Sequence, residues 1–328
     1  MSLYDEIIGH ENIIAQLKRS AGQGKINHAY ILAGGDGAGK NMIAKALAEA
    51  LLCEKQGECG CGVCHACRQV ASDNNPDLRY VIREKATLGV DDVRDQLVGD
   101  IQIKPYNGYH KVYIIDEAEK MTPQAQNAIL KTIEEPPSYG VILLLTNNAE
   151  TLLPTIRSRC ITYECRPLKN SQIEDYLVSR LQIPDYEARV TASFAQGYLG
   201  KAILLAQSEE FSLMKEEALK LVRNVGHYDM GDVAEEIRQL NQYKANITDF
   251  LELLGLWYRD ALLFKVTRDA NRVIFSDELA QIRKQSSHSS YEGLEQILDA
   301  VETAKTRLRA NVNFDLTMEL LILTIKEN

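Results

Sequence analysis

A glycine-rich loop between an apolar run and a helical segment is the feature that most restricts the fold of this chain. The loop, Gly34 to Asn41 (GGDGAGKN), directly follows the apolar run Ala29–Leu32. A short strand, a tight glycine turn and a helix form a βα unit, which belongs in a parallel sheet covered by helices. We therefore expect an α/β fold in at least the first part of the chain.

The same alternation of short apolar runs and helical patterns continues through residues 1–165. Runs rich in Val, Ile, Leu and Tyr are typical of buried parallel strands. The clearest helix is Pro123–Glu135, because Thr122 can cap its start and Pro136-Pro137 must stop it. The expected strands are Ala29–Leu32, Leu78–Ile82, Val112–Ile115, Val141–Leu145 and Ile161–Tyr163.

The pattern changes after Cys165, where strand signals stop and amphipathic helical periodicity continues to Asn328. We expect three domains: an α/β core over 1–165 with a Cys-rich insertion at 53–67, a small helical lid at 166–207, and a helical domain at 208–328. The last part is therefore expected to be all-α.

The glycine loop has the residues of a phosphate-binding site. Gly34, Gly37 and Gly39 let backbone N–H groups turn inward, the helix N-terminus adds positive potential, and Lys40 can reach β and γ phosphates. Asn41 departs from the usual Ser or Thr, whose hydroxyl binds Mg²⁺. The alternative is a glycine turn that binds no ligand.

Two carboxylates, Asp116 and Glu117, end the apolar strand that begins near Lys111. A carboxylate at the end of a parallel strand can hold Mg²⁺ through water, and the next one can polarise an attacking water. The alternative is a solvated acidic turn. Together with the upstream loop, the pair predicts an ATP and Mg²⁺ site.

Four segments carry a family resemblance: Asp116–Thr122 (DEAEKMT), Asn127–Pro137 (NAILKTIEEPP), Leu143–Asn148 (LLLTNN) and Leu153–Cys160 (LPTIRSRC). They resemble the AAA+ ATPases of the bacterial DNA polymerase III clamp loader. The resemblance implies an AAA+ nucleotide-fold core, a helical lid and a C-terminal helical collar for oligomerisation.

The resemblance also implies site residues and partners. Thr146 lies on the family's sensor strand, beside the nucleotide, and Arg159 is the arginine finger that enters the ATP site of a neighbouring subunit. Such a guanidinium neutralises the charge that develops on the transferred γ-phosphate. The implied partners are gamma/tau and delta subunits, the sliding clamp, and primed DNA through the complex.

Two departures from the family pattern separate a motor subunit from a non-motor one. Asn41 removes a Mg²⁺ ligand, and Gly200 stands where a motor subunit carries its sensor arginine. These changes favour a delta prime type of subunit, in which Glu117 is vestigial and ATPase activity is weak or absent. A gamma/tau-like motor is the alternative, since Lys40 and Asp116 are retained, and an AAA+ adaptor outside replication is a third reading.

Five of the seven cysteines fall between residues 53 and 67, which favours a metal site over disulfides in a reducing compartment. Four thiolates at tight spacing suit tetrahedral Zn²⁺, and related clamp-loader subunits hold structural zinc in a similar insertion. Cys59 and His65 are further candidates, but Cys59 would strain to bind beside Cys61. An iron–sulfur cluster and free thiols are the alternatives. The expected ligands are Cys53, Cys61, Cys64 and Cys67.

The charge balance restricts DNA binding. The chain has 37 Lys and Arg against 46 Asp and Glu, a formal net charge of −9, without a basic tail. Any DNA contact must come from a local patch, for which Arg94 and Lys104 are candidates, although each can equally be a solvated surface charge. With no apolar run near the ~20 residues that span a bilayer and no secretory start, we expect a cytoplasmic protein in the nucleoid-associated replication machinery.

Overall fold

The computed structural model describes residues 2–106 and 109–328, which form two compact units. The first comprises residues 1–172 and 197–201, and the second comprises residues 173–196 and 202–328. In the described ranges, the helices are all too short or too polar to cross a membrane.

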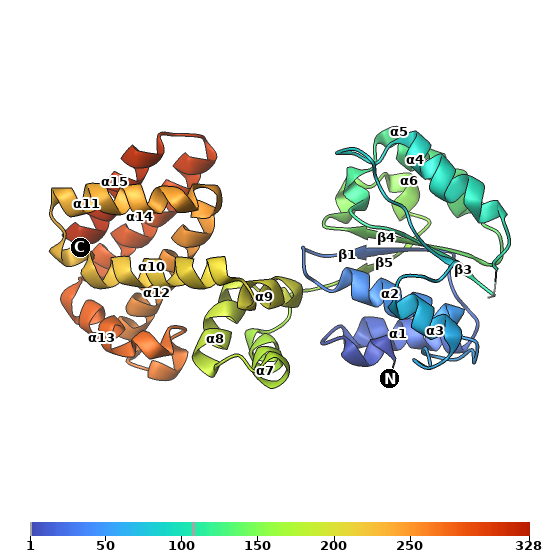
Figure 1. Cartoon of the computed structure of the whole chain (residues 1–328), viewed down its shortest axis with the longest axis horizontal. Coiled ribbons are helices and arrows are strands. Elements are labelled where there is room, and N and C mark those ends of the chain that lie inside the picture. The colour runs from blue at the N-terminus through green and yellow to red at the C-terminus, as the bar shows by residue number, and fades with distance from the viewer. Residues whose placement is uncertain (1, 107–108) are drawn as a thin grey trace. The chain divides into compact units, whose positions relative to one another are not determined.

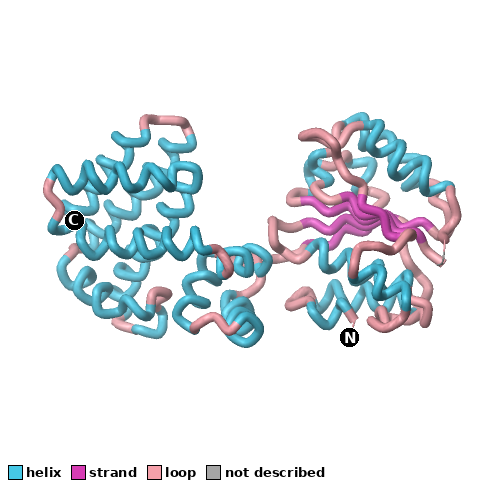
Figure 2. Tube along the Cα trace, viewed as in Figure 1, coloured by secondary structure: helices cyan, strands magenta, loops and turns pink. Residues whose placement is uncertain are grey.

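The first unit is built on a five-stranded parallel sheet in the order β2-β3-β4-β1-β5. Figures 1 and 2 show this sheet together with its helices. The predicted α/β core is therefore confirmed, and all five expected strands form. The strands are β1 (Ala29–Ala33), β2 (Leu78–Tyr80), β3 (Lys111–Ile115), β4 (Gly140–Thr146) and β5 (Ile161–Glu164).

Helices cover both faces of this sheet (Figure 1). Alternate residues of β1, β3 and β4 point to opposite faces, so one core contains Tyr30 and Leu32 with α2, and the other contains Ile31 with α5. The helices are α1 (Glu11–Gly22), α2 (Lys40–Leu52), α3 (His65–Ala71), α4 (Val90–Val93), α5 (Pro123–Glu134) and α6 (Pro154–Arg157), with a π-helical turn at Arg94–Gly99.

Two expected strands differ from prediction in detail. β2 ends at Tyr80 rather than Ile82. The backbone of Ile82 instead pairs with the side chain of Gln96: its N–H donates to Oε1 (2.8 Å), and its carbonyl oxygen accepts from Nε2 (2.7 Å). β5 is mostly exposed rather than buried, since it is the edge strand beyond β1. The α5 prediction is accurate: Thr122 accepts a hydrogen bond from the N–H of Ala125 (3.2 Å).

The second unit is entirely helical (Figure 2). Its core is one cluster whose members run from Val190 to Ile325, and the Phe194 and Phe211 rings lie 5.0 Å apart. The division into a lid and a collar stays a prediction. The helices from residue 170 onward are α7 (Asn170–Leu181), α8 (Asp185–Phe194), α9 (Leu199–Ala206), α10 (Glu209–Asn224), α11 (Met230–Leu240), α12 (Ile247–Thr267), α13 (Leu279–His288), α14 (Tyr291–Arg309) and α15 (Phe314–Glu327). The first three residues of α7 and of α9 belong to the first unit.

Candidate functional site

The glycine loop joins β1 to α2 as a tight turn at the carboxyl edge of the sheet. Gly37 and Gly39 have φ angles of +79° and +86°, a left-handed conformation that glycine adopts without strain. Gly34 packs against Cys165, whose carbonyl oxygen would lie 2.5 Å from any Cβ at position 34. Asn41 is exposed on the first turn of α2. The loop therefore has the backbone shape that the sequence predicts.

Lys40 bonds to the protein itself. Its buried ammonium donates to the carbonyl oxygens of Gly34 and Gly35 (3.1 Å) and to Oδ1 of Asn147 (2.6 Å). The Nδ2 of Asn147 in turn donates to Oδ1 of Asp36 (2.9 Å). All three N–H donors of Lys40 are used in this way. Asn147 was not among the predicted site residues, although it directly follows Thr146 on β4.

The start of α9 covers the loop. The N–H of Gly200 donates to the carbonyl oxygen of Gly37 (2.9 Å), and a Cβ at position 200 would lie 2.8 Å from the Cα of Gly37. The Tyr198 ring packs over Gly35, where a Cβ would lie 2.6 Å from the ring. Position 200 therefore has no room for a side chain in this conformation. The sequence alone did not point to Tyr198.

Asp116 and Glu117 lie at the end of β3, as predicted. Asp116 is exposed and accepts a hydrogen bond from the N–H of Glu117 (2.9 Å). Glu117 has a left-handed backbone (φ +49°), and its carboxylate pairs with Arg83 (2.6 Å) and Lys120 (2.5 Å). The Glu117 carboxylate is thus held between two cations.

Thr146 is completely buried at the end of β4. Its hydroxyl donates to the carbonyl oxygen of Asn148 (3.1 Å) and accepts from the N–H of the same residue (3.2 Å). In this conformation the hydroxyl stabilises its own turn, and the neighbouring Asn147 supplies the contact to Lys40 at the end of the glycine loop.

Arg159 follows α6 and remains partly exposed. Its Nε lies 2.8 Å from Oε1 of Glu134, and its Nη1 donates to the carbonyl oxygen of Thr155 (2.9 Å) and to Oγ of Ser158 (3.2 Å). The side chain of Arg159 is 41% exposed. Unlike Lys40, this cation is accessible at the surface of the first unit.

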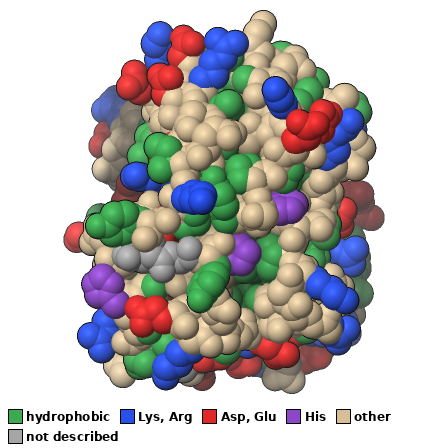
Figure 3. Space-filling view, turned by 90° about the vertical axis from the view of Figure 1, so that its right-hand side faces the viewer, with side chains coloured by type: hydrophobic (Ala, Val, Ile, Leu, Met, Phe, Trp, Pro, Cys, Tyr) green, Lys and Arg blue, Asp and Glu red, His purple; other side chains and the backbone are tan. Residues whose placement is uncertain are grey.

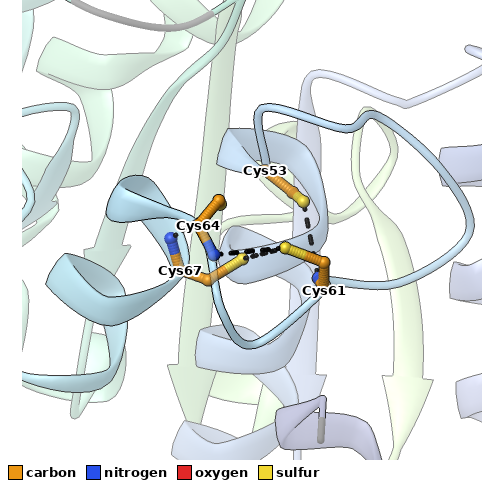
Figure 4. A group of neighbouring side chains, drawn as sticks. All are labelled: Cys53, Cys61, Cys64 and Cys67. Carbon is orange, nitrogen blue, oxygen red and sulfur yellow. Dashed lines mark hydrogen bonds between the residues drawn. The ribbon is translucent and has the colours of Figure 1, made fainter.

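The four expected cysteine ligands come together between α2 and α3 (Figure 4). Their sulfur atoms all lie within 4.8 Å of one another. A tetrahedral zinc ion with Zn–S bonds of about 2.3 Å has S–S edges of about 3.8 Å, so a small contraction would suffice. Cys59 is exposed and outside the group. The four cysteines could therefore bind a metal such as zinc.

Backbone N–H groups support thiolates in this group. The N–H of Cys61 donates to the sulfur of Cys53, the N–H of Cys64 to that of Cys61, and the N–H of Cys67 to that of Cys64. The N–Sγ distance is 3.4 Å in each case. N–H donors from Val63 and Cys64 lower the pKa of Cys61 to about 6. Burial raises the pKa of Cys53 and Cys67, a cost that a bound cation would offset.

The two DNA-contact candidates lie on different segments of the first unit. Arg94 begins the π-helical turn and Lys104 lies in the loop before β3, and both are exposed. On the face shown in Figure 3, Lys and Arg side chains are interspersed with Asp and Glu. A DNA contact by Arg94 or Lys104 therefore stays a prediction.

Comparison with known proteins gives a consistent set of relatives. A family model described as "DNA polymerase III, delta subunit" matches residues 9–169, and one described as "DNA polymerase III, delta subunit, C terminal" matches residues 215–327. DNA polymerase III subunit delta' of Bacillus subtilis is 29% identical over 319 residues, which are 96% of this chain and 95% of that protein.

The tau subunits are also similar. The Bacillus subtilis tau subunit is 30% identical over 80% of this chain and 50% of its own length, and the Escherichia coli tau subunit is 37% identical over 53% and 27%. The chain thus spans half or less of the length of these tau relatives. Among solved structures, a gamma subunit-related protein from Thermotoga maritima aligns with a TM-score of 0.44 and 19% identity over 97% of this chain and 98% of that one.

Proposed function

Because this chain belongs to the family of DNA polymerase III clamp-loader subunits, with delta' as a relative over nearly its full length, we propose that it works as a stationary partner of the ATPase motor. In this role it helps to place the sliding clamp on primed DNA, together with gamma/tau and delta subunits. The observation that carries the proposal is a contrast between two cations: Lys40 is buried and satisfied internally, whereas Arg159 is exposed.

The exposed Arg159 supplies its guanidinium to ATP bound by a neighbouring subunit. Transfer of the γ-phosphoryl group spreads negative charge over its oxygens, and an arginine supplied in trans stabilises that charge. The two N–H groups of Nη2 donate to no described residue and are suited to phosphate oxygens. Arg159 is accordingly the residue through which this chain contributes to catalysis.

Nucleotide binding by the chain's own loop is weak or absent. A nucleotide would need Lys40 to leave Asn147 and would need space beside Gly37, where Gly200 now lies. The residues that would hold ATP and Mg²⁺ in an opened loop are Gly34, Gly37, Gly39, Lys40, Asn41, Asp116 and Thr146.

A gamma/tau-like motor is the second candidate, favoured by the retention of Lys40, Asp116 and Glu117 in their expected places. ATP turnover by the purified chain separates the two functions. We expect the purified chain to hydrolyse little ATP and Lys40→Ala to leave that rate unchanged. Robust hydrolysis that depends on Lys40 would instead establish the motor.

Zinc is the cofactor that we propose for the cysteine group. Closed coordination by Cys53, Cys61, Cys64 and Cys67 leaves no position for a substrate, so the ion would have a structural role.

The decisive experiment for loader membership is co-purification with the other loader subunits. The chain should enter a stable complex with gamma/tau and delta subunits, and Arg159→Ala should assemble equally well but load clamps poorly. A chain that joins no such complex would contradict the proposal.

A further inference from the structure

Arg159 is held at one end of its guanidinium. Nη1 bonds to Thr155 and Ser158 of its own turn, and Nε lies 2.8 Å from Oε1 of Glu134. Within residues 2–106 and 109–328, Nη2 donates no hydrogen bond. The contacts therefore fix the Nε and Nη1 sides of the group and leave the Nη2 end available to an acceptor from another chain.

Glu134 is well placed to fix the arginine because it comes from a different element. It is the last residue of α5, whose position is set by the Thr122 cap and by buried Ile129 and Ile133. The side chain of Gln126, also on α5, accepts a hydrogen bond from the N–H of Leu153 (2.8 Å), just before α6. The backbones that carry the carboxylate and the guanidinium are thus tied together.

The ion pair itself contributes little to stability. The side chains of Glu134 and Arg159 are 44% and 41% exposed, so water screens the attraction between them and little of it adds to the stability of the folded chain. A long, flexible arginine without this partner would sample several rotamers, and fixing one of them carries an entropic cost. The carboxylate can therefore matter for orientation without mattering for folding.

We propose that Glu134 is a positioning residue for Arg159. It holds the Nε side of the guanidinium so that Nη2 projects toward the γ-phosphate of ATP in the neighbouring subunit. Holding a catalytic group in its reactive geometry can be worth about a hundredfold in rate. The inference rests on the proposed function, because it requires Arg159 to act in trans.

The test uses the complete loader reconstituted with this chain, the sliding clamp and primed DNA. ATP turnover is measured for the unchanged chain, Glu134→Ala, Glu134→Gln, Arg159→Ala and the Glu134→Ala/Arg159→Ala double variant. The difference between the unchanged and Arg159→Ala complexes defines the Arg159-dependent turnover. Glu135→Ala is the matched control, because Glu135 is an exposed neighbouring carboxylate outside the Arg159 contacts. Co-elution in size-exclusion chromatography checks assembly of every variant.

We expect Glu134→Ala to lower kcat of the Arg159-dependent turnover by roughly tenfold to a hundredfold, with KM for ATP unchanged. Glu134→Gln keeps an oxygen acceptor and should recover part of the loss, and Glu135→Ala should match the unchanged chain. Glu134→Ala should have no further effect when Arg159 is already alanine, since the two residues act as one unit.

Several results would overturn the inference. One is full turnover by Glu134→Ala, and another is increased turnover, which would mean that Glu134 holds the arginine back. An equal loss with and without Arg159 would show that Glu134 acts through another residue. If Arg159→Ala itself changes nothing in an assembled loader, the finger role fails and this inference fails with it.

Discussion

At the scale of single residues, Asp260 on α12 shows how a buried charge can organise a loop. Its side chain is completely buried, and Oδ2 accepts hydrogen bonds from the N–H groups of Ile274 (2.7 Å) and Phe275 (2.9 Å). Burial raises the pKa of Asp260 to about 6, although the two N–H donors favour the ionised form and lower the pKa. The carboxylate therefore anchors the loop between α12 and α13 while being costly to ionise.

Substitutions of Asp260 test whether its hydrogen bonds anchor the loop. Asp260→Ala leaves two buried N–H groups without an acceptor and should lower the free energy of unfolding by about 2–4 kcal/mol. Asp260→Asn keeps one oxygen acceptor and should cost less. Urea unfolding of both variants measures the difference, and equal stability of Asp260→Ala and the unchanged chain would refute the anchoring role.

The raised pKa of Asp260 also determines how the stability of the chain changes with pH. The folded pKa of about 6 lies above the unfolded value of about 4, so the folded chain binds the proton more tightly. The stability contributed by this proton is present below about pH 4 and is lost as pH rises to about 6. Relative to Asp260→Asn, the unchanged chain should therefore lose stability across that interval.

At the scale of elements, the contact between the start of α9 and the glycine loop depends on the backbones of two glycines, Gly200 and Gly37, which lie against each other. A Cβ at position 200 would lie 2.8 Å from the Cα of Gly37, closer than real Cβ contacts. Gly200→Ala should therefore shift the backbone and lower stability by about 1–3 kcal/mol. Thermal unfolding checks this, with Gly57→Ala as the control, because a Cβ at position 57 would meet no atom within 4 Å.

The cysteine group should determine whether α3 is stable. This helix has seven residues, and isolated helices shorter than about 12 residues are marginal in water. Metal analysis should find one zinc per chain, and chelation should reduce helix content and the unfolding temperature. Cys61→Ser should lose the metal, whereas Cys59→Ser should keep it. Metal-free protein with freely titratable thiols would contradict the proposal.

Local patterns predicted the elements better than the contacts between them. The strands and α5 follow from apolar runs and from the signals at Thr122 and Pro136, which act within a few residues. The glycine loop could also be predicted from a few neighbouring residues. The partners of Lys40 could not be predicted from local sequence, because Asn147 reaches Lys40 only through the pairing of β4 with β1. The pairing of Arg159 with Glu134 likewise depends on packing that no short pattern encodes.

At the scale of the whole molecule, the acidic balance predicts weak DNA binding by the chain alone. A protein gains nonspecific affinity by neutralising phosphates with Lys and Arg, and this chain has a net charge of −9. A filter-binding assay with primed duplex DNA should find weak retention at physiological salt. Tight binding by the isolated chain would contradict this prediction and would place a DNA site on the chain itself.

The chain passes between its two units three times, after residues 172, 196 and 201. This threading has a practical consequence for fragment design. A fragment that stops at the first passage would lack Tyr198 and Gly200 and so uncover the glycine loop. A fragment that starts after the third passage would remove Phe194 from the helical core. No single cut yields both units intact, so they are best studied by substitution within the full-length chain.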